Sequence, residues 1–383
     1  MVEIETMSLA QLRTHKSEKF RNCDPDVLPL PVAEMDFAIA SPIRETLVKM
    51  AMDSDAGYLG SIPELGENLA SFAQKKWGWK IETENVFVAA DVGVAMVEMA
   101  RTVVNPGDKI LINSPVYHNF YNWVEELKCE VFDAPLHQSE LDYSLDFSAI
   151  EAGYKAGVKI HFLCSPHNPV GALFTRDELA HLAELAKKYG VAIFSDEVHG
   201  PLVYSDSEFV PFLAVSDTAR EVGICTTAAS KSWNIAGLKS ATIVVGSSYW
   251  RDRAQTMPKA VHYRASLFGA HAAAVAYSCD EWLEAVLKIL DGNRRFLADQ
   301  LLTKLPQVRY RIPDATYLAW LDLSELRLGD NPAEILLEQG RVSFTPGANF
   351  SPKTSQFIRL NFATSEAVIS EAIDRVVSVV NRG

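Results

Sequence analysis

Short apolar runs alternate with amphipathic stretches through the first two thirds of the chain. The apolar runs have the length of strands and predict buried β-structure at residues 86–90, 109–113, 130–133, 159–164, 191–195, 222–227 and 240–246. Between them, stretches such as residues 93–104 and 175–189 place apolar side chains on one helix face. Continuous apolar strands joined by helices predict an α/β fold with a largely parallel sheet covered on both sides.

The pattern changes in the last third of the chain. Residues 267–305 read as a long helical region. After it come short predicted strands at 308–311, 317–322, 342–345 and 357–361, together with helices at 331–339 and 365–380. Strands and helices in this mixture predict a smaller α+β domain.

Residues 1–45 have poor periodicity and several prolines, so we expect this N-terminal segment to wrap the surface and join the smaller domain. The expected organisation is therefore this segment, a large domain over residues 46–275, and a small C-terminal domain over residues 276–383.

Composition narrows the class of protein. Of the 383 residues, 48% are hydrophobic and 22% are charged, which excludes a disordered, collagen-like or coiled-coil chain. The net charge of -13, with lysine and arginine scattered, argues against binding to nucleic acid or to an anionic membrane. The N-terminus lacks a basic region, and the longest near-apolar stretch, residues 267–277, is short and contains His271, so we expect neither a signal peptide nor a membrane span.

The five cysteines are far apart and form no C-x-x-C pair, so neither a zinc ribbon nor a disulfide framework is expected. No two of the nine histidines have the spacing of metal ligands, and no metal is expected. A reducing cytoplasm is the compartment that this cysteine pattern favours.

Common nucleotide, serine-hydrolase and zinc-protease motifs are absent from the sequence. Instead, polar residues follow three predicted strands, at the edge where open α/β sheets bind ligands. Asn168 lies in a turn after one strand, Asp196 and Glu197 end the next, and Lys231 follows a third. Each alone has an ordinary explanation, as a turn residue, a helix cap or a solvated loop lysine.

The three groups together resemble a known family. The sequence Asn-Pro-x-Gly begins at Asn168, Asp196 follows 28 residues later, and Lys231 of a Ser-Lys pair lies another 35 residues on. This arrangement resembles the pyridoxal-phosphate enzymes of the aspartate-aminotransferase fold (fold type I), and the resemblance extends over essentially the whole chain. It implies an α/β fold with a large cofactor-binding domain and a smaller α+β domain.

A narrower resemblance is to the cystathionine β-lyase-type carbon-sulfur lyases of that fold. It rests on Ala-Glu-Met-Asp-Phe at 33–37, Ser-Pro-His-Asn-Pro-Val-Gly at 165–171, Asp-Glu-Val-His at 196–199 and Ser-Lys-Ser-Trp-Asn-Ile-Ala-Gly-Leu at 230–238. In that subgroup the first motif usually reads Ala-Asp-Met-Asp-Phe and follows a Trp-Val pair. This chain has Glu34 at the second position and Pro31-Val32 before the motif.

The resemblance implies catalytic roles for three residues and a ring contact for a fourth. Lys231 would attach pyridoxal 5'-phosphate and, once freed by the substrate amine, remove the Cα proton, because a buried lysine readily lowers its pKa. Asp196 would pair with the pyridinium nitrogen. Tyr117 would stack on the ring face, and Asn168 would donate to the ring 3-oxygen.

A cofactor phosphate requires donors. The backbone N–H groups of Val92 and Gly93 stand where a predicted strand meets a helix, so they can bind an anion. The resemblance adds Ser230 and Lys239, the latter at a position where many relatives have arginine. It also matches Tyr58 to a tyrosine that reaches the partner subunit's phosphate, which implies a homodimer with shared active sites.

The substrate α-carboxylate favours a bidentate guanidinium. Arg359 is a charged residue inside an apolar predicted strand, and it matches the carboxylate-binding arginine of the family. A solvent-facing strand arginine is the alternative. Tyr58, Tyr121 and His199 are further expected residues of the substrate pocket.

Two reactions compete for this set of residues. A carbon-sulfur β-lyase acts on cystathionine or related S-substituted L-cysteines and gives a thiol, pyruvate and ammonia, and with cystathionine it releases homocysteine for methionine biosynthesis. The alternative is an aminotransferase of a small or aromatic amino acid. The motifs favour the lyase by resemblance, and no single catalytic residue decides the matter. A non-catalytic binding protein of the same fold is disfavoured because Lys231, Asp196, Asn168 and Arg359 are all present.

Overall fold

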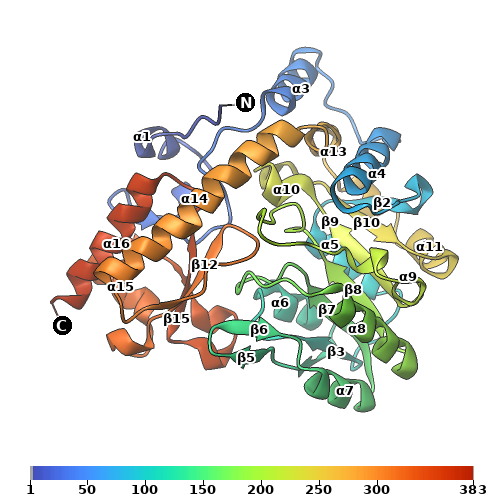
Figure 1. Cartoon of the computed structure of the whole chain (residues 1–383). Coiled ribbons are helices and arrows are strands. Elements are labelled where there is room, and N and C mark those ends of the chain that lie inside the picture. The colour runs from blue at the N-terminus through green and yellow to red at the C-terminus, as the bar shows by residue number, and fades with distance from the viewer. Residues whose placement is uncertain (1–2, 383) are drawn as a thin grey trace.

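The computed structural model describes residues 3–382, which form two lobes built on separate sheets (Figure 1). The strands of the large lobe lie in the order β2-β10-β9-β8-β7-β3-β4. They are β2 (Val86–Ala89), β3 (Lys109–Ile112), β4 (Glu130–Asp133), β7 (Val158–Cys164), β8 (Ala192–Asp196), β9 (Gly223–Thr227) and β10 (Ala241–Val245). Only β10 runs antiparallel to its neighbours, so the prediction of a largely parallel sheet is confirmed.

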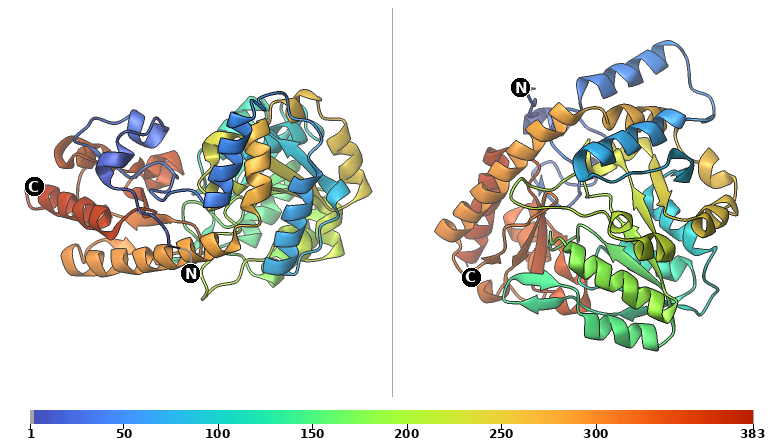
Figure 2. Two further views of the ribbon diagram at one scale, coloured as in Figure 1. Left: turned by 90° about the horizontal axis from the view of Figure 1, so that it is seen from above. Right: turned by 45° about the vertical axis from the view of Figure 1, so that its right-hand side comes forward.

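Helices cover both faces of this sheet (Figures 1 and 2). The helices of the large lobe are α3 (Ser41–Met52), α4 (Pro63–Trp77), α5 (Val92–Ala100), α6 (Asn119–Glu126), α7 (Phe147–Lys155), α8 (Arg176–Tyr189), α9 (Asp217–Val222), α10 (Ala229–Ser232), α11 (Ser248–Gln255), α12 (Ala260–Tyr263) and α13 (Leu267–Ala276). A short hairpin, β5 (His137–Ser139) and β6 (Asp142–Ser144), lies outside the sheet. Successive strand residues, such as Ile193 and Phe194, belong to different core clusters because strand side chains alternate between the two faces.

Helix α8 shows how the local sequence sets these elements. Thr175 caps its first turn, because the Thr175 hydroxyl accepts from the backbone N–H of Glu178 and the Glu178 carboxylate accepts from that of Thr175. Leu179 and Leu182 are fully buried against the sheet. The helix ends at Gly190, whose φ of 66° is left-handed and favours glycine.

The small lobe contains an antiparallel sheet in the order β11-β12-β15-β14. Its elements are β11 (Arg309–Tyr310), β12 (Leu318–Asp322), β14 (Thr345–Pro346), β15 (Phe357–Asn361), α14 (Asp280–Lys304), α15 (Pro332–Gly340) and α16 (Glu366–Val380). Figure 2 shows α14 running from this lobe toward the large lobe. The predicted helical region 267–305 is in fact two helices, α13 and α14, interrupted at residues 277–279.

The N-terminal segment begins with two short helices, α1 (Leu9–Leu12) and α2 (Glu18–Arg21). Strand β1 (Leu28–Pro29) then pairs in parallel with β13 (Val342–Ser343) of the small lobe. This pairing attaches the segment to the small lobe. The expectation that the segment stays on the surface is wrong for residues 35–37. Met35, Asp36 and Phe37 are at most 4% exposed, because they pass between the lobes. The domain limits at residues 45 and 275 stay a prediction.

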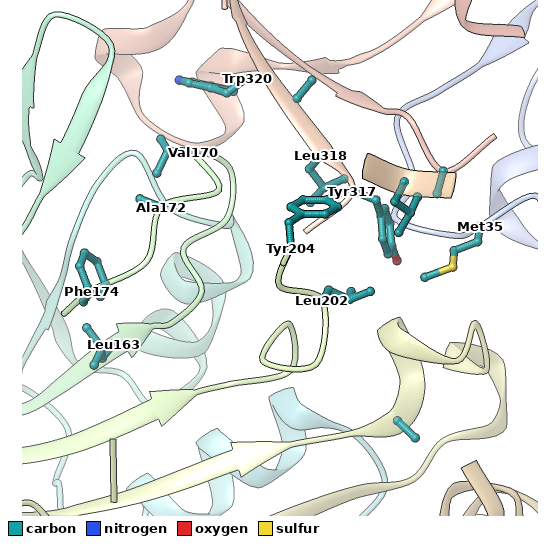
Figure 3. Close-up of a cluster of buried hydrophobic side chains, with 14 of the residues drawn as sticks. Met35, Leu163, Val170, Ala172, Phe174, Leu202, Tyr204, Tyr317, Leu318 and Trp320 are labelled. Carbon is teal, nitrogen blue, oxygen red and sulfur yellow. The ribbon is translucent and has the colours of Figure 1, made fainter. Parts of the chain in front are cut away.

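A cluster of buried apolar side chains lies where the segments meet (Figure 3). Met35 from the N-terminal segment, Leu202 from the large lobe and Tyr317 from the small lobe belong to one core cluster. The lobes and the N-terminal segment are therefore packed against each other through a shared apolar core.

Candidate active site

The carboxyl ends of three strands meet at one edge of the large sheet. Cys164 at the end of β7 pairs with Asp196 at the end of β8, and Asp196 pairs with Thr226 of β9. The loops that follow these strands contain Asn168 and Lys231. Because the strands are parallel and in register, three of the residues singled out in the sequence are brought to the same edge.

Lys231 lies on α10, the short helix directly after β9. Its side chain is half-buried, and its Nζ donates to the backbone carbonyl of Ala33 at 3.2 Å. Burial lowers the pKa of Lys231 to about 8, and the positive charge of the Arg359 guanidinium is the second largest cause of this shift. A lysine with such a pKa has a substantial neutral fraction near neutral pH, so it can act as a nucleophile or a base.

Asp196 is a buried carboxyl group at the end of β8, with 6% of its surface exposed. The backbone N–H of Val198 donates to its Oδ1 at 3.1 Å. Burial raises the pKa of Asp196 to about 7, although the Val198 N–H and the charge of Lys231 act in the opposite direction. A cationic partner would hold this group in its charged form.

Asn168 joins the two lobes at the site. The backbone N–H of Tyr117 donates to the Asn168 carbonyl at 3.0 Å, which connects the loops after β3 and β7. Nη1 of Arg359, on β15 of the small lobe, donates to Asn168 Oδ1 at 3.0 Å. This bond fixes the amide so that its Nδ2 is left as the group that can donate to a ligand.

Arg359 is buried in the small lobe, so the solvent-facing alternative is wrong. Its Nη2 donates to the Pro31 carbonyl at 2.9 Å and to Thr345 Oγ1 at 3.3 Å, and the guanidinium lies 5.0 Å from the ring centre of Phe350. Its Nε is buried and has no hydrogen-bond partner among the described residues. Burial lowers the pKa of Arg359 to about 10, so the guanidinium stays charged at neutral pH.

The two aromatic candidates and the histidine differ in their placement. Tyr117 is half-buried, and Asn119 donates to its hydroxyl at 2.8 Å. His199 is buried, its ring centre lies 6.3 Å from that of Tyr317, and its Nδ1 has no partner among the described residues. Burial lowers the pKa of His199 to about 3, and the positive charges of Lys231 and Arg359 act in the same direction. Tyr121 instead donates to the Phe350 carbonyl at 3.2 Å, which places its hydroxyl at a contact between the lobes.

The predicted anion site lies at the N-terminus of α5, which begins at Val92, one residue before the predicted start, and ends at Ala100 rather than at residue 104. Asp91 caps this helix by accepting from the Val94 N–H at 2.8 Å, and Lys239 forms an ion pair with Asp91 at 3.1 Å. Gly93 has no room for a side chain, because a Cβ atom there would lie 2.9 Å from Trp123 Nε1.

Ser230 is half-buried on α10, next to Lys231. Tyr58 lies on the loop between α3 and α4 and is 89% exposed. The single chain thus leaves this tyrosine facing solvent.

Several residues at the site were not found from the sequence. The backbone carbonyls of Pro31 and Ala33 accept from Arg359 and Lys231, and the Tyr317 hydroxyl donates to Ala33 O at 2.9 Å. Every residue has a backbone carbonyl, so no sequence signal marks these two. Thr345 could have been noticed only by pairing β14 with β15, where it lies opposite Arg359.

These groups fit pyridoxal 5'-phosphate. The half-buried amine of Lys231 suits an aldehyde, and the buried Asp196 carboxyl suits a protonated ring nitrogen. The N-terminus of α5 suits a phosphate. The unpartnered Nε of Arg359 and Nδ1 of His199 are buried polar atoms that a bound amino-acid substrate and cofactor can satisfy.

Metal binding and membrane spanning were both considered in the sequence, and the described residues bear on each. Within residues 3–382, no group of three or more histidine, cysteine, aspartate or glutamate side chains is placed to hold a metal ion. No helix in this described range combines the length and apolarity needed to cross a membrane.

The chain matches one protein family and is similar to several known proteins. The family described as aminotransferase class I and II matches residues 25–376. The chain is 32% identical to the cystathionine beta-lyase of Corynebacterium glutamicum, over 97% of this chain and 99% of that protein. It is 31% identical to the cystathionine beta-lyase PatB of Bacillus subtilis, over 93% of each. The crystal structure of cystalysin from Treponema denticola, which contains a pyridoxal 5'-phosphate cofactor, is 26% identical with a TM-score of 0.90, over 99% of this chain and 98% of that one.

Proposed function

The chain belongs to the class I and II aminotransferase family, and from this premise we propose that it is a pyridoxal-phosphate-dependent carbon-sulfur β-lyase. Its substrates are cystathionine or related S-substituted L-cysteines, and its products are a thiol, pyruvate and ammonia. The observation that carries the proposal is the match to two proteins named cystathionine beta-lyase over at least 93% of both chains. The arrangement of Lys231, Asp196 and Arg359 supports it.

The bound cofactor supplies an electron sink that makes the substrate Cα proton acidic and lets the Cβ–S bond break. Lys231 would hold the cofactor through its ε-amine, at the position where the substrate amine would compete for it. The freed ε-amine, with a pKa of about 8, then accepts the Cα proton. The sulfur leaves with the electron pair of the Cβ–S bond and takes up a proton, and water completes the release of pyruvate and ammonia.

The other residues of the site orient and charge the reactants. With the cofactor bound, Asp196 would keep a proton on the ring nitrogen, Asn168 would donate through Nδ2 to the ring 3-oxygen, and Tyr117 would pack on the ring. The N–H groups of Val92 and Gly93, with Ser230 and Lys239, would bind the phosphate. These roles are proposals supported by the positions of the groups around one sheet edge.

Arg359 would bind the substrate α-carboxylate, and its hydrogen bond to Asn168 would hold this contact close to the residue proposed to face the cofactor ring. His199 is neutral at physiological pH, and we propose that it lines the substrate pocket. Tyr121 is a further proposed residue of the substrate pocket, and its hydroxyl donates to the carbonyl of Phe350.

An aminotransferase is the second candidate, because the family includes that reaction and the same residues serve it. The distinguishing experiment incubates the purified protein with cystathionine and with S-alkyl cysteines, with and without an added oxo acid. We expect stoichiometric pyruvate, ammonia and thiol without the oxo acid. Turnover that depends on the oxo acid would assign the protein to the aminotransferases.

The Arg359→Lys variant tests the carboxylate contact. Lysine keeps the charge but cannot form two parallel bonds, so we expect substrate binding to weaken by ~1.5 to 3 kcal/mol, roughly tenfold to a hundredfold. Pyruvate release should slow, because the contact also orients the Cα–H bond, and the cofactor absorbance should not change. Substrate titration and a pyruvate assay measure both effects. The exposed Arg295, changed to lysine, is the control, and unchanged affinity in Arg359→Lys would remove Arg359 from the site.

We also propose that the protein is a homodimer in which Tyr58 completes the partner's site. The 89% exposure of this aromatic side chain supports the proposal, since exposed large apolar side chains such as Tyr58 and Met52 suit a subunit interface. We further propose a cytoplasmic location and a place in methionine biosynthesis. The five free cysteines of the structure are compatible with a reducing compartment.

Subunit mixing tests the role of Tyr58. An inactive Lys231→Ala chain paired with an impaired Tyr58→Phe chain forms a hybrid in which one of the two sites has both native residues. In a random one-to-one mixture, half of the dimers are hybrids, and each hybrid has one native site out of two. We therefore expect recovery to about a quarter of wild-type activity. Sedimentation establishes the oligomeric state, and labelled subunits establish exchange. A monomer, or exchange without any recovery, would contradict the shared site.

A further inference from the structure

Residues 31–37 form a strap that crosses between the two lobes beside the candidate site. On the small-lobe side it continues β1, whose pairing with β13 fixes its start. The Asn361 N–H donates to the Leu30 carbonyl at 2.9 Å, and the Asp36 N–H donates to the Ala363 carbonyl at 2.8 Å. Asp36 also forms a buried ion pair with Lys19 at 2.7 Å.

Two carbonyls of the strap face the two cations of the site. Pro31 O accepts from Arg359 at 2.9 Å, and Ala33 O accepts from Lys231 at 3.2 Å. Ala33 O also accepts from the Tyr317 hydroxyl. The position of the Lys231 amine is therefore tied to the position of one backbone carbonyl.

One asparagine holds the small-lobe half of the strap. Asn361 is two residues beyond Arg359 on β15 and is fully buried. Its Nδ2 donates to Val32 O at 2.7 Å and to Glu34 O at 2.6 Å. Alternate carbonyls thus point in opposite directions, with 31 and 33 toward the cations and 32 and 34 toward Asn361.

A second asparagine holds the large-lobe half. Asn234 is three residues beyond Lys231, and its Oδ1 accepts from the Met35 N–H at 2.9 Å. Its Nδ2 donates to Met35 O at 2.9 Å and to Phe37 O at 3.2 Å. Three hydrogen bonds from one side chain clamp the strap to the loop that contains the lysine.

We propose that Asn234 is a positioning residue for Lys231, acting through the strap. The inference rests on the proposed function, in which the freed Lys231 amine removes the Cα proton. Asn234 fixes Met35, Met35 fixes Ala33 two residues earlier, and the Ala33 carbonyl orients the lysine amine. Proton transfer depends steeply on such placement, whereas the carboxylate contact at Arg359 is held by a different asparagine.

The test uses the Asn234→Gly holoenzyme. Asn234 has a left-handed φ of 58°, so glycine removes the side chain without strain, which alanine would add. We expect the Met35 amide to exchange with deuterium about tenfold or more faster, because it loses its acceptor. Relative to wild type, kcat should fall roughly tenfold to a hundredfold, while KM changes less than about threefold. The isotope effect on kcat, measured by comparing ordinary substrate with substrate deuterated at Cα, should be larger than in wild type.

Asn293→Ala is the matched control. This buried asparagine on α14 also donates to two carbonyls, Phe362 O at 2.9 Å and Thr364 O at 2.7 Å, but not to the strap. We expect it to lower stability while leaving Met35 exchange and the isotope effect as in wild type. Asn234→Asp keeps an acceptor for the Met35 N–H, so its exchange rate should lie between wild type and Asn234→Gly.

Three results would overturn the proposal: unchanged Met35 exchange in Asn234→Gly, an unchanged isotope effect with kcat within about twofold of wild type, or the same changes in Asn293→Ala. Failure of the lyase assignment is a separate outcome. If wild-type turnover requires an oxo acid, the Asn234 measurements keep their meaning, because both reactions remove the Cα proton.

Discussion

The Lys231→Ala variant is expected to lose carbon-sulfur lyase activity by more than about a thousandfold, because both the covalent attachment of the cofactor and the base for the Cα proton are removed. The native amine has the properties that these roles require. It is half-buried, it has a pKa of about 8, and it is oriented by the Ala33 carbonyl. Pyruvate release measures the loss of activity.

Attachment is measured independently of turnover. Borohydride should fix the cofactor to wild-type protein at Lys231, identified by peptide mass spectrometry, and should fix none there in Lys231→Ala. The exposed Lys187, which pairs with Glu221, provides the control substitution to alanine. Reducible attachment and pH-sensitive absorbance that both persist in Lys231→Ala would refute the assignment.

Asp196→Asn is expected to lower activity by about three orders of magnitude. Asparagine has nearly the same shape but no charge, and loss of one partner of a buried ion pair typically costs ~3 to 5 kcal/mol. The ring nitrogen would then lose its proton and the electron sink would weaken. The borohydride-reducible link to Lys231 should persist, so the defect lies in chemistry rather than in attachment.

Glu197→Gln is the matched control for this prediction. Glu197 is equally buried, and burial raises its pKa to about 7, as it does for Asp196. Its carboxyl instead accepts from the Ser195 hydroxyl and the Phe212 N–H, both at 2.8 Å. We expect activity within a few-fold of wild type. If both variants lose activity equally, the loss reflects a folding defect caused by removing a buried carboxylate at this strand end. Asp196 would then have no special role toward the cofactor.

Much of the site could be predicted because its residues follow strands. Asn168, Asp196 and Lys231 each come after an apolar run, and parallel strands bring their carboxyl ends to one edge. The anion site at the start of α5 could also be predicted, because residues 92 and 93 stand where an apolar strand meets a helix. Arg359 was marked by its charge within an apolar strand.

The path of residues 31–37 could not be predicted. The prolines and weak periodicity of residues 1–45 indicate a surface segment, whereas the structure buries Met35, Asp36 and Phe37 between the lobes. These residues are held mostly through backbone carbonyls and N–H groups, which every sequence provides. The interruption at residues 277–279, which separates α13 from α14, was missed because no glycine or proline marks it.

The sequence by itself determined the elements, the parallel sheet and the identities of the residues at its edge, because helix and strand periodicity is local and strand ends have a fixed geometry. Only the tertiary structure decided which groups touch. Arg359 reaches Asn168 across 191 residues of sequence, and Lys231 reaches Ala33 across 198. Such contacts depend on how the lobes and the strap pack together, and that packing is the sum of many weak, non-local interactions that no short pattern contains.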